Sequence, residues 1–202
     1  MITADYDGTF VVFDGLNGSG KSTAVDFLAE EYPNFSYTYE PSNSQLGQLA
    51  RNLMSEDERR AITITSILVA DRSQHTRRVI LPALKEGQTV ICDRYYDSTY
   101  AFQVPELKAE GVEDPEKMID LMHEGQYIEP DYTIFFDIDP EECADRLSGS
   151  ERYEEISFQY DAYPIYKKRM DERANTTRLD ASQQKMSVRQ DLFDFLSEQS
   201  II

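Results

Sequence analysis

The sequence of 202 residues predicts a single α/β domain with a mostly parallel five-stranded sheet between two layers of helices. Three observations support this prediction. Short runs rich in β-branched and aromatic residues alternate with longer segments of helical pattern. The first run leads into a glycine-rich loop, and the runs at 9–14, 89–93 and 132–138 carry aspartate at or next to their ends. No repeat or linker divides the chain, so residues 1–202 are expected to form one domain.

Five runs are predicted to be strands because they combine apolar, β-branched and aromatic side chains. The first, at 9–14, reads Thr-Phe-Val-Val-Phe-Asp, and the second, at 35–39, alternates aromatic and hydroxyl side chains. Residues 89–93 read Thr-Val-Ile-Cys-Asp, and residues 132–138 read Tyr-Thr-Ile-Phe-Phe-Asp-Ile. The short run Thr-Arg-Leu-Asp at 177–180 completes the sheet.

The segments between these strands are predicted to be helical. At least one such segment follows every strand, as the crossovers of a parallel sheet require. The predicted helices occupy 21–31, 44–54, 61–85, 115–124, 140–147, 157–173 and 186–199.

The loop after the first strand carries the strongest chemical signal. Residues 15–22 read Gly-Leu-Asn-Gly-Ser-Gly-Lys-Ser, which is the G-x-x-x-x-G-K-[ST] phosphate-binding loop, or P-loop, in its strand–loop–helix setting. The glycines let successive backbone N–H groups point at phosphate oxygens. Lys21 adds a cation, the Ser22 hydroxyl can coordinate Mg²⁺, and the following helix offers its positive N-terminal end. The chain is therefore predicted to bind a nucleoside triphosphate.

The charge balance excludes some partners. The chain has 38 acidic and 20 basic residues, a net charge of −18, and a nonspecific nucleic-acid binder needs the opposite sign. The acidity fits either an ordinary soluble surface or adaptation to high salt, and its spread along the chain favours the second. No stretch approaches the length of a membrane span and no signal-peptide pattern opens the chain, so a cytoplasmic protein is expected.

Aspartates at strand ends mark the expected ligand edge of the sheet. Asp14, Asp93 and Asp137 lie where parallel strands place binding sites, although each could equally cap a helix or form a turn. Arg94 directly follows Asp93, and this pair could hold a phosphate and order Mg²⁺.

An apolar stripe in the predicted helix 61–85 turns polar along its length. Ile64, Ile67 and Leu68 are followed at helical spacing by Asp71, Arg72 and His75. Either the helix leaves the core there, or these polar residues belong to a site.

Taken in order, these blocks resemble the thymidylate kinase family, P-loop enzymes that move the γ-phosphoryl group of ATP onto dTMP. The matching blocks are the loop at 15–23, Glu40-Pro41, Ala70–His75, Asp93–Gln103 and Arg152-Tyr153-Glu154 before Phe158, with support from Pro130-Asp131 and Asp180-Ala181-Ser182. The resemblance spans nearly the whole chain. It implies Mg²⁺ as cofactor, ATP and dTMP as substrates, and a homodimer packed through helices such as 61–85.

The resemblance also implies roles for individual residues. Catalysis is expected of Lys21, Asp93, Arg94 and Arg152, with Ser22 and Asp93 serving the metal. ATP is expected to contact Gly15, Asn17, Gly18, Ser19, Gly20, Lys21, Ser22, Thr23 and Arg146. The dTMP site is expected to comprise Asn17, Glu40, Pro41, Leu68, Arg72, Arg94, Ser98, Phe102 and Gln103. Residues 148–157 would form a lid that closes Arg152 over the phosphates, unless Arg152 is a surface residue paired with Glu151 or Glu155.

Three positions depart from the family pattern. Asn17 replaces the usual Asp or Glu, and an amide contributes no charge. Tyr39 stands before Glu40-Pro41 where bacterial-type members have Arg, so one phosphate cation is missing or supplied elsewhere. Leu68 replaces a base-stacking Phe, which could loosen the pocket and admit other deoxynucleotides.

Two alternatives to a dTMP kinase follow from these departures and from the loop itself. One is a kinase of broader specificity for deoxynucleoside monophosphates or deoxynucleosides, and the other is a P-loop switch or ATPase with no small acceptor. The two cysteines, Cys92 and Cys143, are expected in the core. His75 and His123 lack the spacing of metal ligands and are expected to be surface or packing residues.

Overall fold

The computed structural model describes residues 1–56, 60–147 and 155–202. Its centre is a sheet of five parallel strands in the order β2-β3-β1-β4-β5. The strands are β1 (Thr9–Gly15), β2 (Ser36–Tyr39), β3 (Thr89–Asp93), β4 (Tyr132–Asp137) and β5 (Thr176–Asp180). All five predicted strands are confirmed, and the apolar β1 lies at the centre of the sheet between β3 and β4.

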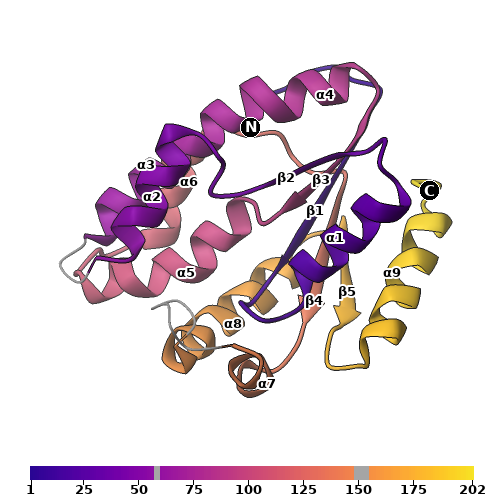
Figure 1. Ribbon diagram of the computed structural model, residues 1–202. Helices are drawn as coiled ribbons and strands as arrows, with labels where there is room; N and C mark the ends of the chain where they lie inside the picture. Colours follow the sequence, from indigo (N-terminus) through magenta and orange to yellow (C-terminus); the bar gives the residue numbers. More distant parts are fainter. Residues whose placement is uncertain (57–59, 148–154) are drawn as a thin grey trace.

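Helices cover both faces of this sheet. In Figure 1, α3 and α5 lie on one side of the strands, and α1 and α9 lie on the other. The helices are α1 (Lys21–Glu31), α2 (Gln45–Met54), α3 (Ala61–His75), α4 (Leu81–Lys85), α5 (Tyr96–Ala109), α6 (Pro115–His123), α7 (Pro140–Asp145), α8 (Ile156–Asp171) and α9 (Lys185–Glu198). The three-layer α/β architecture is therefore confirmed. Among the helices of the described residues, none is long and apolar enough to cross a membrane.

Two predictions about helices were wrong. Residues 96–109 were not assigned to a helix but form α5. Residues 61–85 were assigned to one regular helix, whereas a π-helical turn, η1 (Thr76–Ile80), separates α3 from α4. In a regular helix the ring of Pro82 would clash with the carbonyl group four residues back, and the wider turn lies directly before it.

Alternating side chains of β1 fill two apolar clusters. Val11 and Phe13 pack with residues of α1, α8 and α9, whereas Phe10 and Val12 pack with residues of α4, α5 and α6. Each of these four side chains is fully or almost fully buried. Burial of alternate side chains in different clusters fixes the register of β1, and with it the position of the loop that follows.

Helix α8 is fastened to α5 by charged side chains. The buried Asp97 carboxylate of α5 accepts hydrogen bonds from Arg169 Nε at 2.6 Å and from Arg173 Nη1 at 2.8 Å. This connection holds α8, and its residue Tyr166, next to the carboxyl ends of the strands.

Candidate functional site

The phosphate-binding loop joins β1 to α1, as predicted. Gly18 has a φ of +80°, a left-handed conformation that glycine adopts without strain, and a Cβ there would lie 2.8 Å from the Cys143 carbonyl oxygen. The loop can therefore lie against the C-terminal end of α7 only because this position lacks a side chain.

Lys21 is folded into the loop that it follows. Its Nζ donates to the Leu16 carbonyl oxygen at 2.7 Å and to Ser19 Oγ at 3.1 Å. Burial lowers the pKa of Lys21 to about 7, and the neighbouring Arg94 cation contributes to the decrease. An anion at the loop would favour the protonated form, so its binding and the charge of Lys21 are coupled.

Ser22 and Asp93 meet across the N-terminus of α1. Asp93 ends β3 beside the central strand, and its Oδ2 accepts a 2.7 Å hydrogen bond from Ser22 Oγ. Its other oxygen, Oδ1, is buried and has no hydrogen-bond partner among the described residues. One hydroxyl and one carboxylate with an unused oxygen suit Mg²⁺, which takes few protein ligands and completes its shell with water and phosphate. The donor set therefore fits the metal that the resemblance implies.

Arg94 lies against the phosphate-binding loop. Its Nη1 donates to the Gly15 carbonyl oxygen at 2.9 Å, and its Nη2 donates to Asn17 Oδ1 at 2.5 Å. Nη1 also lies 3.1 Å from Ser98 Oγ and from the Tyr166 hydroxyl oxygen. Arg94 has a φ of +69°, which is uncommon for a residue other than glycine and is typical of functional turns.

A buried carboxylate supports this arginine. Asp14 Oδ1 accepts hydrogen bonds from Ser98 Oγ at 2.7 Å and from the Tyr166 hydroxyl at 2.8 Å, and it lies 4.0 Å from Arg94 Nη1. Burial and the Asp14 charge raise the pKa of Tyr166 well above its usual range, so the phenol stays protonated. Sequence reasoning noted Asp14 as a strand end and missed Tyr166, for which no motif exists.

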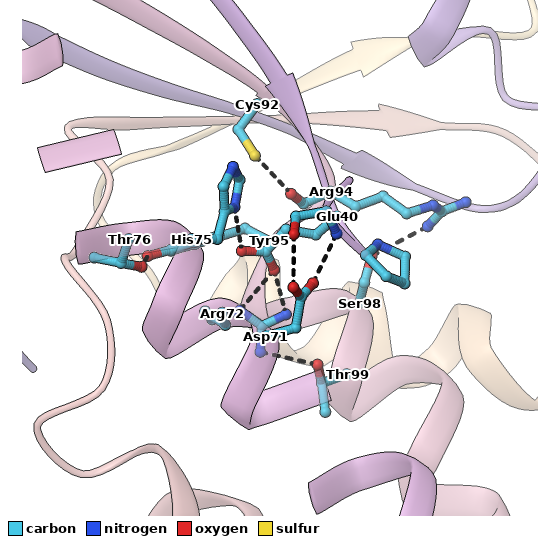
Figure 2. A network of polar contacts seen from close by, with 12 residues as sticks. Glu40, Asp71, Arg72, His75, Thr76, Cys92, Arg94, Tyr95, Ser98 and Thr99 are labelled. Carbon is cyan, nitrogen blue, oxygen red and sulfur yellow. Dashed lines mark hydrogen bonds and ion pairs between the residues drawn. The ribbon is translucent and has the colours of Figure 1, made fainter. Parts of the chain in front are cut away.

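A second buried arginine, Arg72, lies on α3. Its Nε donates to Glu40 Oε2 at 2.7 Å, its Nη2 forms an ion pair with the same oxygen at 2.6 Å, and the other Glu40 oxygen lies 3.0 Å from His75 Nδ1. Figure 2 shows Glu40, Arg72 and His75 in this network beside Asp71, whose carboxylate accepts from the backbone N–H and the hydroxyl of Ser42. The Glu40-Pro41 peptide bond is cis.

The burial of these side chains decides between the two interpretations of the α3 stripe. Asp71, Arg72 and His75 are at most 3% exposed, so the helix does not leave the core where its stripe becomes polar. The two histidines were expected to be surface or packing residues, and their burial excludes the surface alternative. His75 and His123 are both buried, and each contacts the Glu40–Arg72 pair through a ring nitrogen.

Thr99 and His123 complete the surroundings of Arg72, and neither was predicted. Arg72 Nη1 donates to Thr99 Oγ1 at 3.1 Å and lies 2.6 Å from His123 Nε2. Burial and the Arg72 cation lower the pKa of His123 to about 2, so this imidazole is neutral. If α5 had been recognised as a helix, Thr99 could have been found, because it lies one turn before Gln103. Nothing near His123 in the sequence connects it to Arg72.

The remaining predicted acceptor residues lie on α5, on α3 and in the phosphate-binding loop. On α5, Gln103 is buried with its Oε1 3.5 Å from Thr65 Oγ1, and the Phe102 ring centre lies 5.3 Å from Arg94 Cζ. Leu68 is half-buried on α3. The Asn17 backbone N–H donates to Gln159 Oε1 of α8 at 3.2 Å. Proximity to the two arginines agrees with a shared site but does not test the predicted roles.

Tyr39 stands where bacterial-type members of the family have arginine. It is 44% exposed, and its hydroxyl donates to Asn43 Oδ1. A cation does lie nearby. Arg51 of α2, which sequence reasoning did not select, donates to the backbone carbonyl groups of Pro41 and Ser42. Arg51 therefore supports the turn that carries Glu40.

A cavity of about 930 Å³ extends from the loop toward α9. The loop residues 17–24, Asp93 and Arg94 line one end, and Arg146 and the segment 183–186 line the other. Arg146 donates to the Ala181 carbonyl oxygen at 3.1 Å. Arg189, a cavity residue that was not predicted, lies over the Phe27 ring with Cζ 3.0 Å from its centre. This shape suits a triphosphate at the loop and a nucleobase near Arg146. Arg152 and most of the predicted lid lie outside the described residues.

Comparison with known proteins agrees with the resemblance that the sequence motifs indicate. Residues 13–192 match the model of the family described as Thymidylate kinase. A probable thymidylate kinase of Halorubrum lacusprofundi is 32% identical over 191 residues, covering 93% of this chain and 97% of that protein. One of Halobacterium salinarum is 34% identical over 175 residues, covering 86% and 87%. The thymidylate kinase of Verminephrobacter eiseniae is 31% identical over 208 residues, covering 94% and 91%.

Proposed function

The chain belongs to the thymidylate kinase family, and on that premise we propose how its residues transfer the γ-phosphoryl group of ATP to dTMP. The products are ADP and dTDP, a step in the synthesis of dTTP. The position of Arg94 carries the proposal. This cation is bonded to Gly15 and Asn17 of the donor loop and lies on the segment that leads into the acceptor residues of α5.

On the donor side, the loop amides and Lys21 would bind the β- and γ-phosphates, and the adenine would lie against Arg146. Ser22 and Asp93 would hold Mg²⁺, directly or through water. When bound, the metal neutralises charge on the phosphate oxygens. The remaining loop residues would shape the cradle, namely Gly15, Gly18, Ser19, Gly20 and Thr23.

On the acceptor side, Arg94 would bind the dTMP phosphate and Arg72 would donate to the thymine edge with help from Gln103. Glu40 and Pro41 would form the wall beside Arg72. The sugar and the base would contact Asn17, Leu68, Ser98 and Phe102. Asn17 would bond the 3′-hydroxyl, and the pocket lined by Ser98 and Phe102 would exclude a ribose 2′-hydroxyl.

The reaction forms one bond and breaks another at the γ-phosphorus. An oxygen of the dTMP phosphate bonds to that phosphorus while the bond to the bridging oxygen breaks, and its electron pair leaves with ADP. Catalysis is then a matter of alignment and of charge stabilisation by Lys21, Arg94 and Arg152. Closure of the lid at 148–157 would exclude water and so suppress ATP hydrolysis.

A coupled assay of ADP formation with dTMP, dUMP, dGMP, dCMP and thymidine tests this function. We expect dTMP to give the highest kcat/KM. Comparable rates with several deoxynucleotides or with thymidine would instead support the kinase of broader specificity, and absence of turnover with dTMP would reject the proposal. Slow ATP hydrolysis that no monophosphate changes would indicate a P-loop switch.

Three further properties are proposed from the resemblance, the composition and the substrates. We propose a homodimer that uses the 61–85 region, where Val79 is an apolar side chain with 43% exposure. Sedimentation should then give twice the 23.3 kDa mass of the chain.

We also propose adaptation to high salt, given the net charge of −18. Because both substrates are intracellular nucleotides, the proposed place of action is the cytoplasm.

A further inference from the structure

We propose that His123 is a positioning residue for substrate selection: its neutral imidazole accepts a hydrogen bond from Arg72 and holds the guanidinium in the orientation that contacts the acceptor base. The inference rests on the proposed function, because it assigns a support to the arginine that would contact thymine. His123 is the last residue of α6 and lies far along the chain from the residues that the sequence motifs identify.

The direction of the bond follows from the chemistry of the two groups. Arginine is always protonated and has only donors, so Arg72 Nη1 must donate and His123 Nε2 must accept at 2.6 Å. The imidazole therefore carries its proton on Nδ1. A doubly protonated ring would direct an N–H group at another N–H group and place two cations in contact.

His123 supplies a bond that Arg72 needs. In this guanidinium Nε donates to Glu40 and Nη1 donates to Thr99 and His123, while Nη2 lies 2.6 Å from the same Glu40 oxygen as an ion pair. Within the described residues, Nη2 makes no hydrogen bond beyond this ion-pair contact. A guanidinium hydrogen-bonded through Nε and Nη1 cannot rotate freely, so Nη2 keeps a fixed direction.

Burial makes the loss of any of these bonds costly. Arg72 and His123 are each 2% exposed, so water cannot easily replace the imidazole. Rings also hold the imidazole, since Tyr100 stacks on it at 5.8 Å between ring centres and Tyr127 meets it edge-on at 5.9 Å. His123 is thus a rigid acceptor, and its role is to orient Arg72 rather than to contact substrate.

The free N–H of Arg72 Nη2 would select for an acceptor atom on the nucleobase. Thymine presents a carbonyl oxygen at position 4, whereas cytosine presents an amino group there, which is a second donor. If His123 fixes Arg72, removal of its acceptor should weaken dTMP binding and reduce discrimination against dCMP.

Two substitutions separate the acceptor from the packing role. His123→Phe keeps an aromatic ring but removes the acceptor, and His123→Gln keeps an acceptor oxygen near the position of Nε2. We expect His123→Phe to raise the KM for dTMP about tenfold and to lower the dTMP-to-dCMP ratio of kcat/KM, with the KM for ATP within twofold. His123→Gln should recover most of both values. Leu121→Ala, at an exposed position of the same helix, is the control for effects on α6.

The outcomes distinguish the inference from the proposed function. Activity of the unchanged enzyme on dTMP together with unchanged dTMP kinetics in His123→Phe would overturn the inference alone, as would equal defects in the Phe and Gln variants. No turnover of dTMP by the unchanged enzyme would overturn both. If His123→Phe does not fold, ¹⁵N spectra of the two histidines in the unchanged protein provide a separate test. A neutral His123 ring with Nε2 unprotonated from pH 5 to 8 supports the inference, and a proton on Nε2 contradicts it.

Discussion

The hydroxyl group of Tyr166 should matter for turnover as well as for stability. It donates to Asp14 at 2.8 Å, accepts from Arg94 Nη1 at 3.1 Å and lies 2.6 Å from Ser98 Oγ, all in a buried site. Tyr166→Phe removes bonds to two charged groups, each contributing roughly 1.5–3 kcal/mol. Since Ser98 and the Gly15 backbone N–H still serve Asp14, we expect a loss of about 2–3 kcal/mol in the free energy of unfolding.

For a chain of this length, such a loss lowers Tm by roughly 4 to 12 °C. We also expect kcat to fall about tenfold, because Arg94 loses one of its anchors at the site of phosphoryl transfer. Thermal unfolding and the coupled ADP assay at 25 °C measure the two effects separately, provided that the variant is folded at the assay temperature.

Tyr163→Phe is the matched control. It lies on the same helix, and its hydroxyl also donates to an aspartate at the end of a strand, Asp137, at 2.8 Å, but it does not contact Arg94. This variant should lose a smaller amount of stability and keep kcat within twofold. If Tyr166→Phe is destabilised as expected but retains the kcat of the unchanged enzyme, Tyr166 has a structural role only and does not position Arg94.

Four other predictions concern the loop, the lid and the charge of the chain. Because Lys21 in the unliganded protein has a pKa of about 7, it is largely neutral at pH 8, and phosphate binding should restore its proton. Calorimetry at pH 8 in two buffers of different ionisation enthalpy should show uptake of nearly one proton per ATP. Lys21→Met should abolish this uptake. The affinity for ATP should also fall as pH rises above 7. Arg152→Ala should cut turnover severely with little change in ATP affinity, and near-normal turnover would mean that Arg152 is a surface residue. Gly18→Ala should raise the KM for ATP at least tenfold, since the added Cβ would meet the Cys143 carbonyl oxygen and the φ of +80° disfavours alanine. Unchanged kinetics would show that the loop shifts at little cost. Raising KCl from 0.1 to 1 M should lower the KM values for both nucleotides and raise Tm, whereas the opposite trend would reject the salt adaptation.

The parts of the site that could be predicted are those encoded in contiguous residues. The loop at 15–22 and the Asp93-Arg94 pair each carry their chemistry within a few positions, and a strand end determines where they lie. Tyr166 and His123 are different, because they reach their partners across 152 and 51 positions of the chain. Neither is distinguished by its neighbours in sequence, so only the packing of α8 and α6 reveals what they do.

Helix α5 was missed for a related reason. Its buried residues point to several sides, toward α3, α8 and β1, and include the polar Asp97, Thr99 and Gln103. No single apolar stripe therefore repeats at the helical period, and Pro105 within the helix interrupts the pattern further. A helix that is enclosed by other elements and forms the wall of a polar site lacks the signal that identified the surface helices α2 and α6.

The two buried arginines differ in their partners, and this difference matches the two halves of a nucleoside monophosphate. Arg72 is paired with the Glu40 carboxylate at 2.6 Å, so its charge is compensated and it is suited to a neutral hydrogen-bond acceptor such as a base carbonyl group. Arg94 bonds a backbone carbonyl oxygen, two hydroxyl groups and the Asn17 amide, and in the described part of the chain its nearest ion-pair partner, Asp14 Oδ1, lies 4.0 Å away.

The charge of Arg94 is therefore only partly compensated and remains available to an anion. Asn17, which departs from the acidic residue usual in the family, contributes to this state because an amide accepts the Arg94 bond without adding a negative charge. In a chain of net charge −18, long-range attraction cannot bring phosphate to the site. Recognition must then depend on contacts within about 3 Å, a range over which even molar salt screens little. An uncharged residue at position 17 is consistent with that requirement, since it leaves more of the Arg94 charge available to the phosphate that we propose it binds.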